Sequence, residues 1–278
     1  MPIPDGYLWE SDDLREEMAN PTLAKHFGPL PPTTTASGSL ADSQFDAEKV
    51  PFTTGDPDPM TISGTTGKTA ALLALVVASG MWGWSLVDPD TGSSAIPGWW
   101  FIALIGAVIL AIVTAFKPQI ARFTGPLYAV TMGSALGVIS HLYNAAYNGI
   151  VLQAILATSA VFMVMLVLFV TGTIKVTDRF RGVVIGATVG IFVFYLATLL
   201  LSLVGISIPL VSGPFGILVS VFIVSIAALN LMLDFDFIVR GTAAGAPKYM
   251  EWYGAFGLTV TIIWMYMEML RLLSRIRN

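Results

Sequence analysis

The stretch PFGILVSVFIVSIAALNLMLDFDFI, residues 214–238, decides the fold class. It carries no charge before Asp234, and the run up to Phe235 is long enough to cross about 30 Å of hydrocarbon at about 1.5 Å per helical residue. Its apolar positions are continuous rather than alternating, which favours a helix, because a helix satisfies its own backbone hydrogen bonds in lipid. The stretch therefore predicts a membrane-spanning helix that ends in two acidic residues, Asp234 and Asp236.

Six further runs share this character, so the chain predicts an integral membrane protein. Of its 278 residues, 55% are hydrophobic and 12% are charged, which is more apolar surface than a single soluble core would bury. We expect an all-α fold, a seven-transmembrane-helix bundle over residues 67–278. The predicted helices cover approximately residues 68–87, 98–116, 126–146, 149–170, 182–204, 214–235 and 253–273.

Residues 1–66 differ from the rest in composition and charge. They are rich in Pro, Thr, Ser, Gly and Asp, and residues 1–60 hold eleven acidic side chains against three basic ones. Without a sustained apolar period, such a segment cannot bury enough surface to offset the entropy lost on ordering. It also lacks the basic stretch leading into an apolar one that a secretory signal needs. We expect a disordered acidic tail on the cytoplasmic side.

The basic residues of the loops predict the orientation in the membrane. The connections 117–125, 171–181 and 236–250 contain Lys or Arg, whereas the other three contain neither. The positive-inside rule makes these basic loops cytoplasmic, so the amino terminus lies inside and, after seven crossings, the carboxyl terminus lies outside. Three arginines within residues 271–277 oppose that result. They leave a re-entrant last segment, with six full crossings, as the alternative.

Several patterns suggest specific chemistry but lack an essential residue. SGTTGKT, residues 63–69, resembles a phosphate-binding loop, but Ile62 stands where that motif requires glycine. The last predicted helix has no lysine for a retinal Schiff base. The chain has no cysteine, and it lacks the Gly-x-Ser-x-Gly and His-Glu-x-x-His patterns of hydrolases. We therefore expect neither an enzyme nor a nucleic-acid-binding protein, and we expect membrane lipids as its surroundings.

Ionisable residues at membrane depth are the candidates for function, because burying one costs about 2.5 kcal/mol or more. Glu268 and Arg271 are three residues apart on one helix face, so they could form a structural ion pair instead. His141, near the end of the third predicted helix, is a candidate proton relay, although an interfacial histidine is more often simply hydrogen-bonded. The acidic candidates are Asp234, Asp236, Glu251 and Glu268.

Glycines recur in two of the predicted helices. Gly133 and Gly137 lie in the third, and Gly182, Gly186 and Gly190 lie at four-residue spacing in the fifth. Small residues at such spacing let helix backbones approach closely. We expect both sets to lie at contacts between helices.

Four motifs, taken in order, carry a resemblance. They are PLYAVTMGSALGVISHLYN (126–144), GIVLQAILATSAVF (149–162), ALNLMLDFDFI (228–238) and WMYMEMLRLL (264–273). Their order resembles the Bax-inhibitor-type (TMBIM) membrane proteins, including the bacterial YccA-like proteins. The fourth helix of that family has Gln-Ala and then Thr, and an apolar-Tyr-Asp segment and Leu-Tyr-Leu-Asp follow on the last two helices. The matching residues here are Gln153, Ala154, Thr158, Leu233, Asp234 and Met265 to Glu268.

The resemblance implies a calcium-permeable leak in a bacterial inner membrane, gated by two acidic residues on the last two helices that share a proton. Carried over by motif, the pair is Asp234 with Glu268, and these acids would hold Ca²⁺ weakly and transiently. Arg271 would be a latch beside them, and no firmly bound cofactor is expected. The chain departs from the family at Glu268, where Asp is usual, and at Phe235 and Asp236, which replace Thr and Gln.

Geometry leaves the partner of Asp234 open. A straight last helix would carry Glu268 about 22 Å from its start, far from Asp234. Residues 246–257 could form an extension that lowers Glu268, the helix could be re-entrant, or Glu251 could be the partner. The alternative function is a non-conducting regulator that binds another membrane protein, such as a quality-control protease, through the acidic tail.

Overall fold

A computed structural model describes residues 58–87, 98–203, 205 and 213–277. Within them the chain forms seven α-helices, all of which are long and apolar enough to cross a membrane. The predicted all-α bundle of seven transmembrane helices is confirmed. The elements are α3 (Ile62–Ser85), α4 (Trp99–Phe116), the 3₁₀ turn η3 (Pro118–Ile120), α5 (Ala121–Ala146), α6 (Ile150–Val170), α7 (Asp178–Leu203), α8 (Gly213–Ala243) and α9 (Met250–Arg277).

The first described helix begins at Ile62 rather than at residue 68. Thr61 caps it, since its backbone is extended and its hydroxyl accepts a hydrogen bond from the Gly64 amide at 3.0 Å. Residues 62–66, which the sequence assigned to the disordered tail, are therefore helical. The remainder of that tail, residues 1–57, lies outside the described residues.

The last two helices are longer than their apolar runs. α8 continues to Ala243 rather than ending near residue 235, and α9 starts at Met250 rather than at 253. Asp236 and Arg240 lie one helical turn apart in the additional part of α8 and form an ion pair at 2.8 Å. The charged residues therefore end the apolar run without ending the helix.

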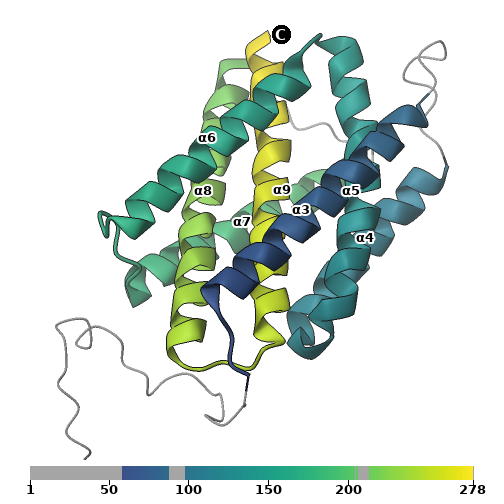
Figure 1. The fold of residues 1–278 in the computed structure, drawn as a ribbon. Helices are drawn as coiled ribbons and strands as arrows, with labels where there is room; N and C mark the ends of the chain where they lie inside the picture. The colour runs from purple at the N-terminus through teal and green to yellow at the C-terminus, as the bar shows by residue number, and fades with distance from the viewer. Residues whose placement is uncertain (1–57, 88–97, 204, 206–212, 278) are drawn as a thin grey trace, which may run out of the picture. The chain divides into compact units, whose positions relative to one another are not determined.

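Helix α9 lies in the middle of the bundle. It contacts α3, α5, α6 and α8, and α8 runs beside it in the opposite direction (Figure 1). α3 packs along α5, and α7 contacts α8. Leu231 and Met232 of α8 and Met265 of α9 are fully buried in one apolar cluster. Polar residues of α9 are consequently placed inside the bundle.

The re-entrant alternative for the last segment does not agree with the shape of α9. It is one unbroken helix of 28 residues, so it extends about 42 Å. Two of its terminal arginines bind neighbouring backbone: Arg275 donates to the Gly216 carbonyl at 2.7 Å, and Arg277 donates to the Asn148 carbonyl at 3.0 Å. These contacts give the arginines a structural reason to lie at this end of the bundle.

The two sets of glycines have different surroundings. A Cβ on Gly137 would collide with the carbonyl of Gly80, and one on Gly133 would collide with the Val76 backbone, so close packing of α3 on α5 requires glycine. The prediction for the fifth predicted helix is wrong within the described residues. A Cβ at any of its three glycines would meet nothing within 4 Å, because they lie on the exposed face of α7, at Gly182, Gly186 and Gly190.

Candidate functional site

Asp234 has a buried carboxylate oxygen without a partner. It lies on α8, and its Oδ1 is 3.6 Å from the position that a Cβ would take on Gly257 of α9. The Thr261 side chain interacts with the same carboxyl group. Oδ2 is buried and accepts no hydrogen bond from any described residue. Because a buried charge without a partner is costly, this oxygen is where a proton or a cation would be favoured.

A cavity of about 510 Å³ surrounds Asp234. It lies between α4, α7, α8 and α9, and its polar lining includes the Asn230 amide and the side chains of Arg181 and Arg240. Asn230 donates to the Thr188 hydroxyl at 2.7 Å and to the Ile226 carbonyl at 2.9 Å, so its side-chain oxygen is left to accept from other donors or to bind a cation. The cavity is therefore lined by one carboxylate and one amide, and Arg181 and Arg240 form its basic rim.

Asp236 pairs with the two arginines that line the cavity. Its carboxylate accepts hydrogen bonds from Arg181 of α7 at 2.7 Å and from Arg240 of α8 at 2.8 Å. Arg240 also donates to the Val176 carbonyl, in the segment before α7, at 3.1 Å. Asp236 is 7% exposed and both arginines are partly exposed, so the three charges form a compact group that ties α7 to α8.

Glu268 is fully buried and lies in a separate group. The Tyr195 hydroxyl donates to its carboxylate and lies 2.9 and 3.0 Å from the two oxygens, and Arg271 donates to the same group at 2.7 Å. The Arg271 guanidinium also lies 4.8 Å from the centre of the Tyr195 ring. The structure thus contains the ion pair that the spacing of Glu268 and Arg271 suggested, and adds Tyr195 of α7 to it.

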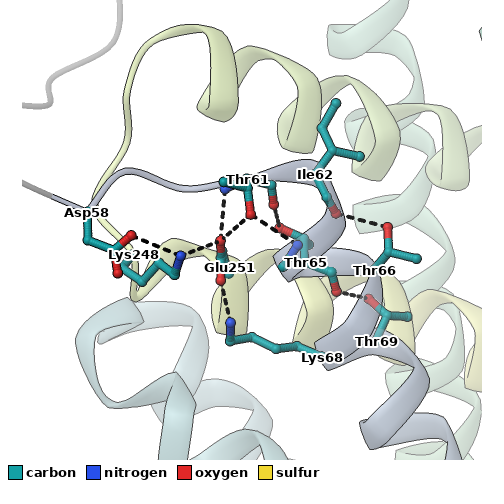
Figure 2. Close-up of polar contacts among 10 residues, drawn as sticks. Asp58, Thr61, Ile62, Thr65, Thr66, Lys68, Thr69, Lys248 and Glu251 are labelled. Carbon is teal, nitrogen blue, oxygen red and sulfur yellow. Dashed lines mark hydrogen bonds and ion pairs between the residues drawn. The ribbon is translucent and has the colours of Figure 1, made fainter.

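Glu251, also fully buried, joins the start of α3 to the start of α9, as Figure 2 shows. One carboxylate oxygen accepts from the Thr61 amide and from its hydroxyl, both at 2.8 Å, and the other oxygen pairs with Lys68. A Cβ on Gly64 would collide with this carboxylate, so a glycine at this position lets the start of α3 approach Glu251 closely. Lys248 approaches Glu251 at 3.5 Å.

Lys248 also binds Asp58, which precedes the first described helix. It forms an ion pair with Asp58 at 3.0 Å, and this hydrogen bond raises the pKa of Lys248 above its ordinary value. A raised lysine pKa means that Lys248 stays charged at neutral pH and loses its charge only as the pH rises into the alkaline range. A pH response near neutrality would therefore come from another group.

The four acidic candidates do not meet. Along α9, Thr261 marks the level of Asp234, and Glu268 is seven residues further on, about 10 Å along the helix. The carboxylates of Asp234 and Glu268 thus have different neighbours, and Lys68, rather than Asp234, is the partner of Glu251. Among the described residues, no three acidic or histidine side chains lie close enough together to hold a metal ion.

His141 lies apart from these groups, in the last part of α5. Its ring meets the Trp84 ring edge-on, with 5.1 Å between the centres, and its Nδ1 is buried without a hydrogen-bond partner among the described residues. Its role as a relay stays a prediction.

Seven apolar helices around a buried polar interior define a multi-pass membrane protein. Comparison with protein families identifies the group: the model of the Bax inhibitor 1 like family matches residues 15–278. The chain belongs to that family, as the four motifs indicated. Comparison with curated proteins finds no match. Comparison with solved structures also finds none.

Sequence reasoning missed the partners of the acids. Arg181 and Tyr195 lie on α7, and Lys68 lies on α3, far along the chain from the carboxylates that they bind. Lys68 gave one signal, because it is a charge within an apolar helix and therefore needs a counter-charge. The other two gave none, since a basic residue at a helix end and a tyrosine in an apolar run are ordinary features of membrane helices.

Proposed function

We propose that the protein is a pH-sensitive leak pathway for calcium ions or protons in a bacterial inner membrane, with Asp234 as the group that takes up the proton or the cation. One observation carries the proposal: Asp234 has a buried carboxylate oxygen without a partner and lines a cavity of about 510 Å³. A group of this kind is neutralised most readily by a proton or a bound cation. The family and the seven-helix bundle agree with a channel-like role.

The proposed path has one polar end on each side of an apolar barrier. Ions would enter past the rim formed by Asp236 and its two arginines and reach Asp234 in the cavity. Beyond it, Leu231, Met232 and Met265 are fully buried against one another, and Glu268 lies on the far side. An apolar constriction of this kind gates by excluding water, so it must widen for ions to pass.

In this proposal Asp234 and Glu268 act in series rather than as one pair that shares a proton. Asp234 accepts the ion first, and Glu268 becomes available when its bonds to Arg271 and Tyr195 open, which makes Arg271 a latch. Ca²⁺ binding would be weak, because one carboxylate and one amide supply few of the six to eight oxygen ligands that Ca²⁺ prefers. By the positive-inside rule the loops that contain Lys and Arg would face the cytoplasm, and Asp236 with its two arginines would lie on that side.

Flux into proteoliposomes tests the proposal. Ca²⁺ and proton entry would be measured from about pH 5 to pH 8 for the unmodified chain, Asp234→Asn and Glu268→Gln. Asp178→Asn is the matched control, because it makes the same change at an exposed acid at the start of α7. We expect flux that varies with pH, loss of that variation in Asp234→Asn, reduced flux in Glu268→Gln, and no change in Asp178→Asn.

Two results would count against this function. Flux in Asp234→Asn with the same pH dependence as the unmodified chain would remove Asp234 from the mechanism. Absence of protein-dependent flux under every condition would favour the non-conducting regulator, in which the amino-terminal tail binds another membrane protein. Deletion of residues 1–57 separates the two functions, because a leak should survive it and a tail-dependent interaction should not.

A further inference from the structure

A second cavity, of about 490 Å³, lies away from Asp234, between α3, α5, α6 and α9. Its size is within the range of small-molecule sites. Val77 and Met81 of α3 and Ile155 of α6 line it and are each about half exposed or more, so it opens between α3 and α6, which share the near face in Figure 1. That face belongs to membrane-spanning helices, so the opening faces lipid.

Thr158 of α6 lines this cavity and has an unsatisfied hydroxyl. Its side chain is 5% exposed, and its Oγ1 is buried with no hydrogen-bond partner among the described residues. Threonines in a helix usually bond the carbonyl four residues earlier, and Thr114, Thr131 and Thr259 do so here at 2.6 to 2.8 Å. An unpaired hydroxyl at membrane depth is costly, so Thr158 indicates a missing partner.

The other polar side chains that line the cavity are also uncharged. The Ser140 and Tyr266 hydroxyls both line the cavity and bond each other at 2.7 Å. In such a pair only one hydroxyl hydrogen is used, so the other remains able to donate to a ligand. No Lys or Arg lines the cavity, which leaves nothing to neutralise a phosphate or a carboxylate. The lining therefore selects an uncharged molecule.

The depth of these hydroxyls narrows the ligand class further. Thr158 is eight residues from the start of α6 at Ile150, about 12 Å along the helix, and Ser140 is six residues from the end of α5 at Ala146, about 9 Å. Both depths lie within a hydrocarbon layer of about 30 Å. A phospholipid would have to draw its headgroup well below the interface to reach them, whereas a molecule that dissolves wholly in the hydrocarbon would not.

We propose that this cavity binds an uncharged, lipid-soluble molecule with a hydroxyl or carbonyl oxygen, which bonds the Thr158 hydroxyl and the Ser140 and Tyr266 pair while its hydrocarbon part fills the apolar walls. A change of the threonine rotamer turns Oγ1 toward the cavity, since helical threonine has two accessible rotamers. The site is independent of the proposed leak, because it shares no lining residue with the cavity of Asp234.

Photolabelling of the full chain in proteoliposomes tests this site. Three probes would carry the same alkyl chain with the same diazirine and differ only in the polar group: a long-chain alcohol, its methyl ester, and a monoacyl phosphocholine. The labelled residues would be mapped by peptide mass spectrometry. We expect saturable labelling of residues 73–84 and 151–159 by the alcohol, the ester or both, and labelling by the phosphocholine that only rises in proportion to its amount. The alcohol and ester arms distinguish a hydroxyl ligand from a carbonyl ligand.

Three variants make the test specific. Ile155→Trp should fill the cavity and reduce labelling by the uncharged probes to the phosphocholine level, whereas Leu156→Trp, next to it on α6 and outside the lining, should leave labelling unchanged. Thr158→Val keeps the side-chain shape and should weaken the apparent affinity about two- to tenfold, the value of one hydrogen bond. Since the hydroxyl has no partner in the protein, this variant should fold normally.

Unsaturable labelling that is equal for all three probes would overturn the proposal and show that ordinary bilayer lipid fills the cavity. Saturable labelling that Ile155→Trp and Leu156→Trp leave equally unchanged would also overturn it, because the probe would then bind elsewhere. An unaltered affinity in Thr158→Val would refute the assigned hydrogen bond. None of these results bears on ion flux, so the two proposals fail independently.

Discussion

Lys68→Met should destabilise the protein by about 2 kcal/mol, because it removes the cation from a buried ion pair. The Glu251 side chain is fully buried and that of Lys68 is 20% exposed. Removing one partner of a fully buried pair costs about 3–5 kcal/mol. Here one Glu251 oxygen keeps both bonds from Thr61, and water reaches the lysine end of the pair, so we expect a smaller loss.

The measurement is equilibrium unfolding of the purified full chain in mixed micelles of a mild detergent and SDS. The SDS fraction at the midpoint of unfolding reports the stability of each variant. Glu251→Gln and the double variant complete a cycle with Lys68→Met, and the cycle isolates the interaction between the two side chains. We expect a coupling energy of about 1–2 kcal/mol, less than the loss in Lys68→Met alone, because that single variant also leaves a carboxylate unpaired. Lys248→Met is the matched control, and it should shift the midpoint much less, since the Lys248 side chain is more exposed than that of Lys68 and lies 3.5 Å from the same carboxylate.

Two results would refute this reasoning. If Lys68→Met and Lys248→Met shifted the midpoint equally, burial would not distinguish the two lysines, and the pair would behave as an ordinary surface pair. If the cycle gave no coupling, the contact of α3 with α9 would rest on the packing around Glu251 rather than on its charge. The site could then not be described as an electrostatic one.

Three further predictions can be checked separately. Gly137→Ala should cost about 1–3 kcal/mol in the same unfolding assay, whereas Gly186→Ala, on an open face, should be neutral or slightly stabilising. Tyr195→Phe removes the hydroxyl that donates to a buried carboxylate and should cost about 1–3 kcal/mol; an unchanged midpoint would contradict it. The chain has no cysteine, so an impermeant thiol reagent on intact cells should label Asn148→Cys but not Lys175→Cys, and the opposite result would reverse the proposed orientation.

The helices could be predicted from sequence because a long, continuous apolar run is enough to define a helix in lipid. A run such as residues 214–235 must be helical to satisfy its backbone, whatever its neighbours are. The helix ends could not be predicted in the same way. α3 starts at Ile62 because Thr61 caps its first turn and is itself held by Glu251, which is distant in sequence. The local Ser, Thr and Gly composition alone resembles a loop.

Most partners of the acidic residues could not be predicted, because contacts between different helices leave no local pattern in the sequence. Glu268 with Arg271 could be predicted from spacing, because both lie on one helix face. The same rule shows nothing about Arg181 and Asp236, which come from different helices. The spacing of Gly182, Gly186 and Gly190 shows the opposite error: the pattern permits a close contact, but no described part of the bundle makes it.

The structure nevertheless ranks acids that are equivalent in the sequence, because it shows what opposes each charge. Asp236, Glu251 and Glu268 each have an arginine or a lysine within ion-pair distance, so each must lose that partner before it can hold a proton or a cation. No described Lys or Arg lies within that distance of Asp234, and one of its oxygens is buried and unbonded. The cost of burial that made all four acids candidates is therefore already offset at three of them. At Asp234 the Thr261 side chain interacts with the carboxyl group but no described cation opposes its charge, so a proton or a mobile ion would complete the offset, which is the physical reason to test that residue first.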